Sequence, residues 1–209
     1  MAATPTLAPM RPPLRTGRLH GAVVLVPVKS FATAKARLAP TLDPERRATL
    51  ARAMAERVLA AAAPLPVAVV CDDDDVARWA AGHGAMVLGE PGRGLNGAVQ
   101  TGVARLGAAG ATEVLVVHGD LPLAEGIVSL AGHPGITLVP DRREDGTPVV
   151  CVPPSAGFRF SYGPGSFQRH VAEARRLGFD PRIARAPALR ADVDEPADLP
   201  LSSSLWKGR

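Results

Sequence analysis

The sequence predicts an α/β fold in which a mostly parallel central sheet carries helices on both faces. Short apolar runs alternate along the chain with segments of helical pattern, which is typical of parallel strands joined by helices. Some runs, such as residues 114–117, hold four consecutive apolar residues, as expected of strands buried on both faces. With 209 residues, 46% of them hydrophobic, the chain suits one core. We therefore expect a single domain over residues 21–209, after a disordered tail at residues 1–20.

The first elements of this pattern are a β-branched strand at residues 21–28 and a long helix. Asp43 supplies a capping carboxylate for that helix, Pro44 suits its first position, and alanine-rich sequence continues it to Ala63. Four acidic residues at 72–75 precede the next helical pattern. Because the helix dipole favours negative charge there, we interpret them as a helix start and not as a metal site. The other predicted elements are strands at 66–71, 85–88, 113–117 and 136–139 and a helix at 97–106.

The alternation of strands and helices breaks after Asp141. A turn is predicted at residues 145–148, a strand at 149–152 and a strand-like segment at 158–162. A helix then follows Gly165. We expect this part to form a small β-rich lobe on the sheet.

Composition limits the function classes. The 24 Lys and Arg against 20 Asp and Glu give a net charge of +4, but aromatic residues are only 4% and no basic run is interleaved with them, so a nucleic-acid partner is not predicted. No stretch of roughly 18 apolar residues indicates a membrane span. Cys71 and Cys151 lie in or beside apolar strands and are expected to be buried free thiols, which favours a cytoplasmic protein.

Two acidic segments suggest a metal site. Asp120 follows the strand at 113–117, at the end where open α/β sheets bind ligands. Asp192 and Asp194 are two residues apart, so on an extended segment both carboxylates point to the same side. Three oxygen ligands without histidine or cysteine favour magnesium or manganese. Alternatively, each aspartate caps a turn or the last helix.

The loop after the first strand carries three cations and two hydroxyls: Lys29, Ser30, Thr33, Lys35 and Arg37. Such a loop at the carboxyl end of a strand could bind a triphosphate. Solvated side chains on a surface loop are the alternative interpretation.

Two glycine-rich segments are further candidates. Residues 92–97 match G-x-G-x-x-G, the dinucleotide fingerprint, but they follow the third strand instead of the first, so a nicotinamide-dependent enzyme is kept only as an alternative. Residues 163–166 place backbone N–H groups and the Ser166 hydroxyl at a helix start, which suits an anion. His170, four residues further on, is interpreted as a histidine on the face of that helix.

Taken together, several segments make the chain similar to the 2-phospho-L-lactate and phosphoenolpyruvate guanylyltransferase family of coenzyme F-420 biosynthesis. The resemblance covers residues 21–199 and is carried by residues 26–38, Gly94-Leu95-Asn96, residues 119–123, Asp145-Gly146-Thr147, residues 158–170 with Gly-Pro-Gly-Ser-Phe, and residues 192–199. One departure is Pro148, which begins Pro-Val-Val-Cys where family members usually carry an Asn-Ala-Leu-like run. Proline has no N–H, so backbone donation is lost there.

The resemblance implies a Rossmann-like nucleotidyltransferase fold that uses GTP and Mg²⁺. It implies these roles: metal binding by Asp120, Asp192 and Asp194; catalysis by Lys29, Lys35 and Asp120; nucleotide binding by Lys29, Lys35, Gly94, Leu95 and Asn96; and binding of the three-carbon phosphoacid by Thr147, Gly163 and Ser166.

The expected reaction is transfer of GMP from GTP to the phosphate of phosphoenolpyruvate, with release of pyrophosphate. The substrate phosphate is already anionic, so no protein base is needed. The acceptor 2-phospho-L-lactate or 3-phosphoglycerate, and a GTP-binding protein without turnover, remain alternatives. A related enzyme acting on sugars or a molybdenum cofactor is disfavoured because the first loop lacks glycines. A homodimer is one assembly that the chain could adopt.

Overall fold

The computed structural model describes residues 19–90 and 92–205. Within them, the strands are β1 (Ala22–Pro27), β2 (Val67–Cys71), β3 (Met86–Gly89), β4 (Glu113–Val117), β5 (Thr137–Val139), β6 (Val149–Val152) and β7 (Arg182–Ile183). The α-helices there are α1 (Pro44–Ala61), α2 (Asp74–Gly82), α3 (Gly94–Ala108) and α4 (Ser166–Arg176). The tail expected at 1–20 lies outside the described residues except for its last two, of which Leu19 donates its N–H to the Ala109 carbonyl at 2.9 Å.

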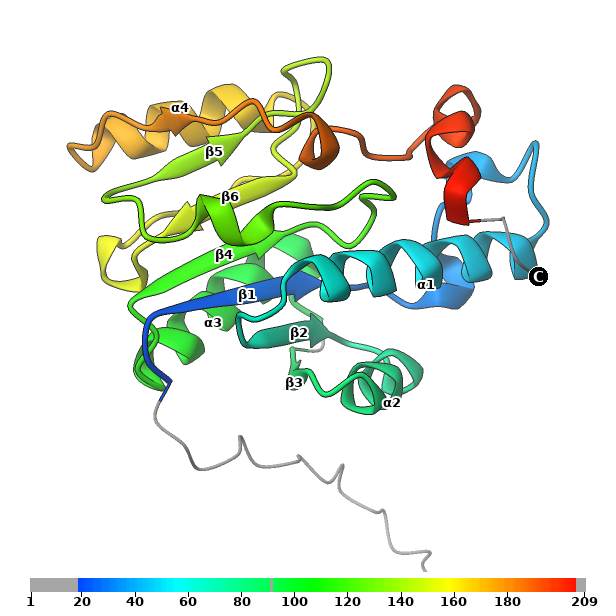
Figure 1. Cartoon of the computed structure of the whole chain (residues 1–209), viewed down its shortest axis with the longest axis horizontal. Coiled ribbons are helices and arrows are strands. Elements are labelled where there is room, and N and C mark those ends of the chain that lie inside the picture. The colour runs from blue at the N-terminus through cyan, green and yellow to red at the C-terminus, as the bar shows by residue number, and fades with distance from the viewer. Residues whose placement is uncertain (1–18, 91, 206–209) are drawn as a thin grey trace, which may run out of the picture.

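The described strands form one sheet in the order β3-β2-β1-β4-β6-β5-β7, visible from bottom to top in Figure 1. Strands β1 to β4 pair in parallel, and β6 runs antiparallel to both β4 and β5. The mixed, mostly parallel α/β sheet is therefore confirmed. The β-rich part expected on the sheet after Asp141 is built into it: β6 and β7 extend the central sheet, because β6 continues the hydrogen-bond ladder of β4.

Both faces of the sheet are covered, as predicted. Alternate residues of β1 point to opposite sides: Val24 and Val26 pack with α1 and α2, whereas Val23 and Leu25 pack with α3 and aromatic residues around α4. Figure 1 shows α1 and α3 on opposite sides of the strands. The resulting double layer of buried side chains holds the carboxyl ends of the parallel strands in fixed positions.

A third apolar cluster joins the loop after β1 to the end of the chain. Leu38, Leu50 and Met54 pack in it against Val193, and all four side chains are almost fully buried. Leucines of the 3-10 helix η6 (Pro196–Leu205) complete the cluster. The ribbon of η6 lies beside the end of α1 at the right of Figure 1. This contact brings residues 192–194 to the loop after β1.

Helix starts follow capping chemistry where the sequence indicated it. Asp43 accepts the N–H of Arg46 at 2.8 Å, and Asp73 accepts those of Asp75 and Val76, so the acids at 72–75 begin α2 as interpreted. Helix α3 begins at Gly94, three residues earlier than predicted.

The segment at 158–162 belongs to no described strand, contrary to expectation. Its alternating aromatics face the core, but side-chain amides of α3 replace a strand partner. Asn96 bonds both the N–H and the carbonyl of Tyr162, and Gln100 bonds the N–H of Phe160 and the carbonyl of Phe158.

Cys71 and Cys151 are buried and free, as predicted. Among the described helices none is long and apolar enough to cross a membrane.

Candidate active site

The cavity of interest lies where the strand order reverses. The chain passes from β1 to β2 and β3 on one side and then returns to β4 on the other side of β1. Open α/β sheets bind ligands at the carboxyl ends of the strands at this point. A cavity of about 700 Å³ opens there, and its lining includes all five polar residues predicted in the first loop: Lys29, Ser30, Thr33, Lys35 and Arg37.

Lys35 lies at the centre of this site. Its Nζ donates to Asp120 Oδ2 at 2.7 Å and to Asp194 Oδ1 at 3.0 Å, and its side chain is only 10% exposed. Its backbone has φ 53° and ψ 43°, a left-handed conformation that costs a non-glycine residue about 1–3 kcal/mol. The fold thus holds Lys35 in a strained turn that directs its ammonium group between two carboxylates.

The pKa values reflect this concentration of charge. Burial alone would lower the pKa of Lys35, but Asp120 and Asp194 outweigh it and raise the pKa to about 12. Burial would raise the pKa of Asp120, yet Lys35 holds it below its usual range. Asp192 has no such cation: burial first, then repulsion by Asp120 and Asp194, raises its pKa to about 6. The three carboxylates therefore form one anionic site with Lys35 as its internal cation.

The position of Asp192 and Asp194 follows from the residue between them. Val193 is fully buried in the cluster with Leu38 and Met54. Because side chains alternate on an extended segment, its two neighbours face away from that cluster. Asp194 thereby reaches the cavity lining beside Asp120. This agrees with the geometry expected from their spacing, although Asp192 is not in the lining.

The donor set fits a hard divalent cation. Within the described residues, no three Asp, Glu, His or Cys side chains are grouped closely enough to hold a metal, and Lys35 Nζ lies between Asp120 and Asp194. However, Asp120 Oδ1 is buried and has no hydrogen-bond partner. A buried carboxylate oxygen without a partner is costly and is a ready ligand for Mg²⁺. The Asp194 carboxylate accepts a hydrogen bond from Lys35 instead of capping the helix that follows.

Of the three residues expected on the nucleotide side, two line the cavity and one does not. Gly94 and Leu95 line the cavity at the start of α3. Asn96 instead points its amide to the backbone of Tyr162, with an N–H···O distance of 2.6 Å. Asn96 therefore connects α3 to the aromatic segment and does not face the cavity.

The expected phosphoacid residues lie outside the cavity lining. Thr147 Oγ1 and Ser166 Oγ are 3.3 Å apart, each residue is 2% exposed, and neither they nor Gly163 are in the cavity lining. The backbone donors expected at this helix start are engaged within the protein: the Asp145 carboxylate accepts the N–H of Gly165, and the Asp145 backbone carbonyl accepts the N–H of Phe167. The Asp145 carboxylate thus lies where an anion was expected.

His170 belongs to the same buried cluster and not to an exposed helix face. Its Nε2 accepts the N–H of Ser161 at 2.9 Å, and Nδ1 lies 3.0 Å from Thr147 Oγ1. Since a backbone N–H can only donate, Nδ1 carries the proton of the neutral ring and donates to Thr147. Thr147 and Ser166 share one further hydrogen bond, so His170, Thr147 and Ser166 form a continuous buried chain of polar contacts.

His170 should make the protein less stable in mild acid. Burial, aided by His118 and Arg169 and opposed by Glu173, lowers the pKa of His170 from 6.5 to about 4. As the pH falls below 6.5, His170 becomes protonated in the unfolded chain but stays neutral in the folded protein. The free energy of unfolding therefore decreases as the pH decreases. Between about pH 7.5 and 5, this group should remove about 2 kcal/mol of unfolding free energy. Urea unfolding should show this slope in the wild type and lose it in His170→Gln; equal slopes would contradict the assignment.

Other residues of the site were not singled out from the sequence. His118 lines the cavity one residue after β4; burial lowers its pKa, and its Nε2 has no hydrogen-bond partner. Glu90, also in the lining, is paired with Arg105 at 2.8 Å. Neither stands in a pattern that would have indicated a role. Asp198 lies in the segment 192–199 that carries part of the family resemblance. Its spacing of four residues from Asp194 was the signal that could have indicated a contact between the two.

Solved structures of nucleotidyltransferases share this fold. A nucleotidyl transferase from Methanothermobacter matches with a TM-score of 0.65 and 17% identity, covering 88% of this chain and 97% of that chain. CMP:2-keto-3-deoxy-manno-octonic acid synthetase, solved with CTP, matches with a TM-score of 0.57 and 15% identity, covering 88% and 98%. The fold is that of the nucleotidyltransferases.

Residues 22–201 match the family described as guanylyl transferase, CofC like, and the chain belongs to this family. Relatives support the membership. A phosphoenolpyruvate guanylyltransferase of Sphaerobacter thermophilus is 37% identical over 85% of this chain and 90% of its own length. Proteins of the same name from Rubrobacter xylanophilus and Conexibacter woesei are each 38% identical over 84% of this chain, and over 90% and 84% of their own lengths.

Proposed function

We propose that this protein transfers GMP from GTP to the phosphate of phosphoenolpyruvate and releases pyrophosphate, as a step of coenzyme F-420 biosynthesis. One observation carries the proposal: in a chain of the guanylyl transferase family, Lys35, Asp120 and Asp194 converge on a cavity at the reversal point of the sheet. The choice of phosphoenolpyruvate rests on the names of the relatives. The cytoplasmic location and the homodimer stay predictions.

Asp120, Asp192 and Asp194 would hold Mg²⁺. Bound there, Mg²⁺ would neutralise phosphate charge and stabilise the charge that develops at the reacting phosphorus. The unpartnered oxygen of Asp120 supports this role, as does the pKa of Asp192, which is raised first by burial and then by repulsion from Asp120 and Asp194. With the carboxylates occupied in this way, Lys35 is free to turn its ammonium group toward phosphate.

The cations of the first loop would bind the triphosphate. Lys29 and Arg37 line the same cavity as Lys35, and so do Gly94 and Leu95 at the start of α3. Charge-assisted hydrogen bonds from these side chains would hold the β- and γ-phosphates and offset the charge on departing pyrophosphate.

The acceptor supplies its own nucleophile. An oxygen of its phosphate attacks the α-phosphorus of GTP, a new P–O bond forms, and the bond to the β-phosphate breaks with its electrons leaving on pyrophosphate. No proton has to be removed from the attacking oxygen, so the protein's task is to align two anions that repel each other. Thr147, Gly163 and Ser166 would hold the acid; this assignment rests on the family resemblance, since Thr147 and Ser166 bond each other beside His170 and lie outside the cavity lining.

Lys29→Ala should raise the KM for GTP roughly tenfold, since a hydrogen bond between charged groups is worth about 1.5–3 kcal/mol. Lys29 is exposed in the cavity lining, so its removal should not disturb folding. Arg175→Ala, which removes an exposed cation from the last turn of α4, is the matched control. Steady-state kinetics at saturating acceptor provide the measurement, and equal effects of the two changes would make Lys29 an ordinary surface lysine.

The acceptor is decided by product analysis. Purified protein is incubated with GTP, Mg²⁺ and either phosphoenolpyruvate, 2-phospho-L-lactate or 3-phosphoglycerate, and the guanosine product is identified by mass. We expect the phosphoenolpyruvate adduct. A product with only one of the other acids would overturn the acceptor and spare guanylyl transfer, whereas turnover of another nucleotide alone would overturn both.

A further inference from the structure

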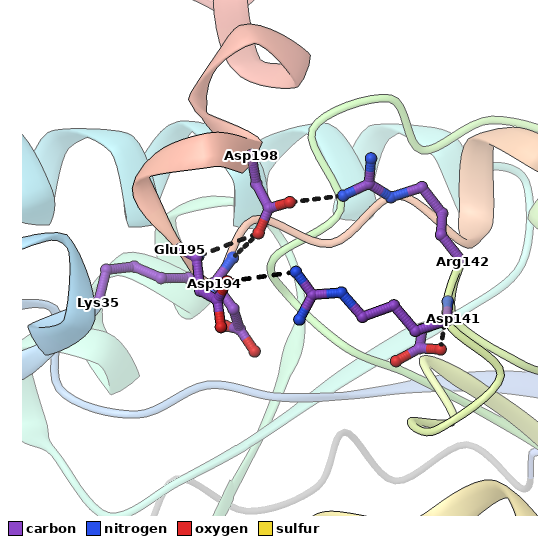
Figure 2. A network of polar contacts seen from close by, with 7 residues as sticks. Lys35, Asp141, Arg142, Asp194, Glu195 and Asp198 are labelled. Carbon is purple, nitrogen blue, oxygen red and sulfur yellow. Dashed lines mark hydrogen bonds and ion pairs between the residues drawn. The ribbon is translucent and has the colours of Figure 1, made fainter.

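Asp198 is a buried carboxylate that joins three parts of the chain through hydrogen bonds. It lies in the first turn of η6 and is 6% exposed. Its Oδ2 accepts the backbone N–H of Asp194 at 3.1 Å and of Glu195 at 3.0 Å, and its Oδ1 accepts from Arg142 Nη2 at 2.6 Å. Figure 2 shows these bonds converging on Asp198. Both oxygens are thus engaged, and neither is directed to the cavity.

The consequence concerns Asp194. A bond to its N–H fixes the peptide next to the Cα that carries the carboxylate, and the buried Val193 fixes the residue before it. The Asp194 carboxylate then extends to Lys35, whose Nζ lies 3.0 Å from its Oδ1. Asp198 therefore sets the direction of a proposed metal ligand without touching the cavity itself.

Arg142 brings a second segment into this arrangement. It lies in the loop between β5 and β6, which leads to Thr147. Asp141 organises that loop: its carboxylate accepts the N–H groups of Arg143, Asp145 and Gly146 at 2.8–3.0 Å. A Cβ at Gly146 would lie only 2.8 Å from Asp141 Oδ2, so the turn requires glycine. Arg142 consequently extends from a well-fixed loop.

We propose that Asp198 and Arg142 are a positioning pair, which aims the Asp194 carboxylate at the divalent cation and aligns the metal-binding segment with the loop that carries Thr147. The inference rests on the proposed function, since that function supplies the cation and the acceptor. Neither residue contacts substrate; each acts through its neighbour.

The chain contains a matched control for this pair. Arg143 follows Arg142 in the sequence, and Glu195 follows Asp194. These two residues form an ion pair of 3.2 Å between the same two segments. Their side chains are 64% and 47% exposed, against 9% for Asp198. An exposed ion pair contributes little because water screens it, whereas the buried Asp198 also holds two backbone N–H groups.

The test measures Mn²⁺ binding by electron paramagnetic resonance, with GTP present and no acceptor. Asp198→Asn keeps the shape but places an NH₂ group against either Arg142 or the two N–H donors. We expect the dissociation constant of Mn²⁺ to rise roughly 10–100-fold, as for other residues that orient metal ligands. Arg142→Met should raise it less, and the double variant should bind no worse than Asp198→Asn. Glu195→Gln and Arg143→Gln should leave it unchanged.

Activity supplies a second readout. If Asp198 positions Asp194, excess Mg²⁺ should restore much of the kcat of Asp198→Asn, and the KM for GTP should change little. Unchanged Mn²⁺ affinity, or an equal change in Glu195→Gln, would overturn the proposal. If Asp198→Asn does not fold, Arg142→Met decides alone in the same assay. Weakened Mn²⁺ binding in a protein whose wild type makes no guanosine product would support the positioning pair and overturn the proposed function.

Discussion

Asp120→Asn should lower kcat on the order of 10³-fold while the protein still folds. A neutral amide cannot replace a carboxylate on Mg²⁺, and Asp120 is the most enclosed of the proposed ligands, with one oxygen on Lys35 and the other without a partner. Even residues that only orient metal ligands cost about 10–100-fold when changed, so a direct ligand should cost more. Asp192→Asn and Asp194→Asn should act in the same direction. The measurement is pyrophosphate release at saturating GTP and acceptor.

The control for Asp120 is Glu125→Gln, which removes an exposed carboxylate from the same loop. Thermal unfolding should show that both variants fold. Pyrophosphate release near the wild-type rate from all three aspartate variants would contradict the metal site.

Lys35→Met should reduce kcat/KM for GTP about 100-fold, as expected when a charged group at a developing anion is lost. It should also destabilise the metal-free protein, since Asp120 and Asp194 would face each other without their cation. Breaking a fully buried pair costs about 3–5 kcal/mol. Here the two carboxylates are 26% and 48% exposed, so solvent screening reduces the expected loss to about 1–2 kcal/mol.

The loss of stability in Lys35→Met should depend on pH and on added Mg²⁺. Asp120 has a lowered pKa, so its stabilisation by Lys35 is present above its usual value of 3.8 and is lost as pH falls through the lower folded value. The difference between wild type and Lys35→Met should therefore shrink in acid. Added Mg²⁺ should raise the melting temperature of the variant more than that of the wild type. A variant with wild-type kinetics and no response to Mg²⁺ would contradict this role of Lys35.

The local sequence pattern was sufficient to predict strands that consist of a continuous apolar run. The strand at 113–117 was predicted with the bounds that β4 has, because a continuous apolar run suits only a strand covered on both faces. The alternating pattern at residues 158–162, by contrast, led to a wrong prediction of a strand. Its alternation of Phe158, Phe160 and Tyr162 reflects burial of one side, but its backbone partners are the amides of Asn96 and Gln100, which no local pattern reveals.

The site shows the same division. The spacing of Asp192 and Asp194 predicted that both carboxylates share one side; the structure buries Val193 between them and brings Asp194, but not Asp192, to the cavity lining. The ion pair of Lys35 with Asp120 joins residues 85 positions apart, and no local rule links them. Likewise, the sequence indicated anion-binding N–H groups before α4, but not that Asp145 occupies them.

The fate of each phosphate of GTP is the decisive measurement. With GTP labelled at the α-phosphorus, the label should move into a diphosphate-linked adduct of guanosine and phosphoenolpyruvate. With GTP labelled at the γ-phosphorus, it should be recovered entirely as pyrophosphate. Recovery of the γ-label as inorganic phosphate, with the α-label in GDP, would mean that the protein hydrolyses GTP, and would contradict guanylyl transfer.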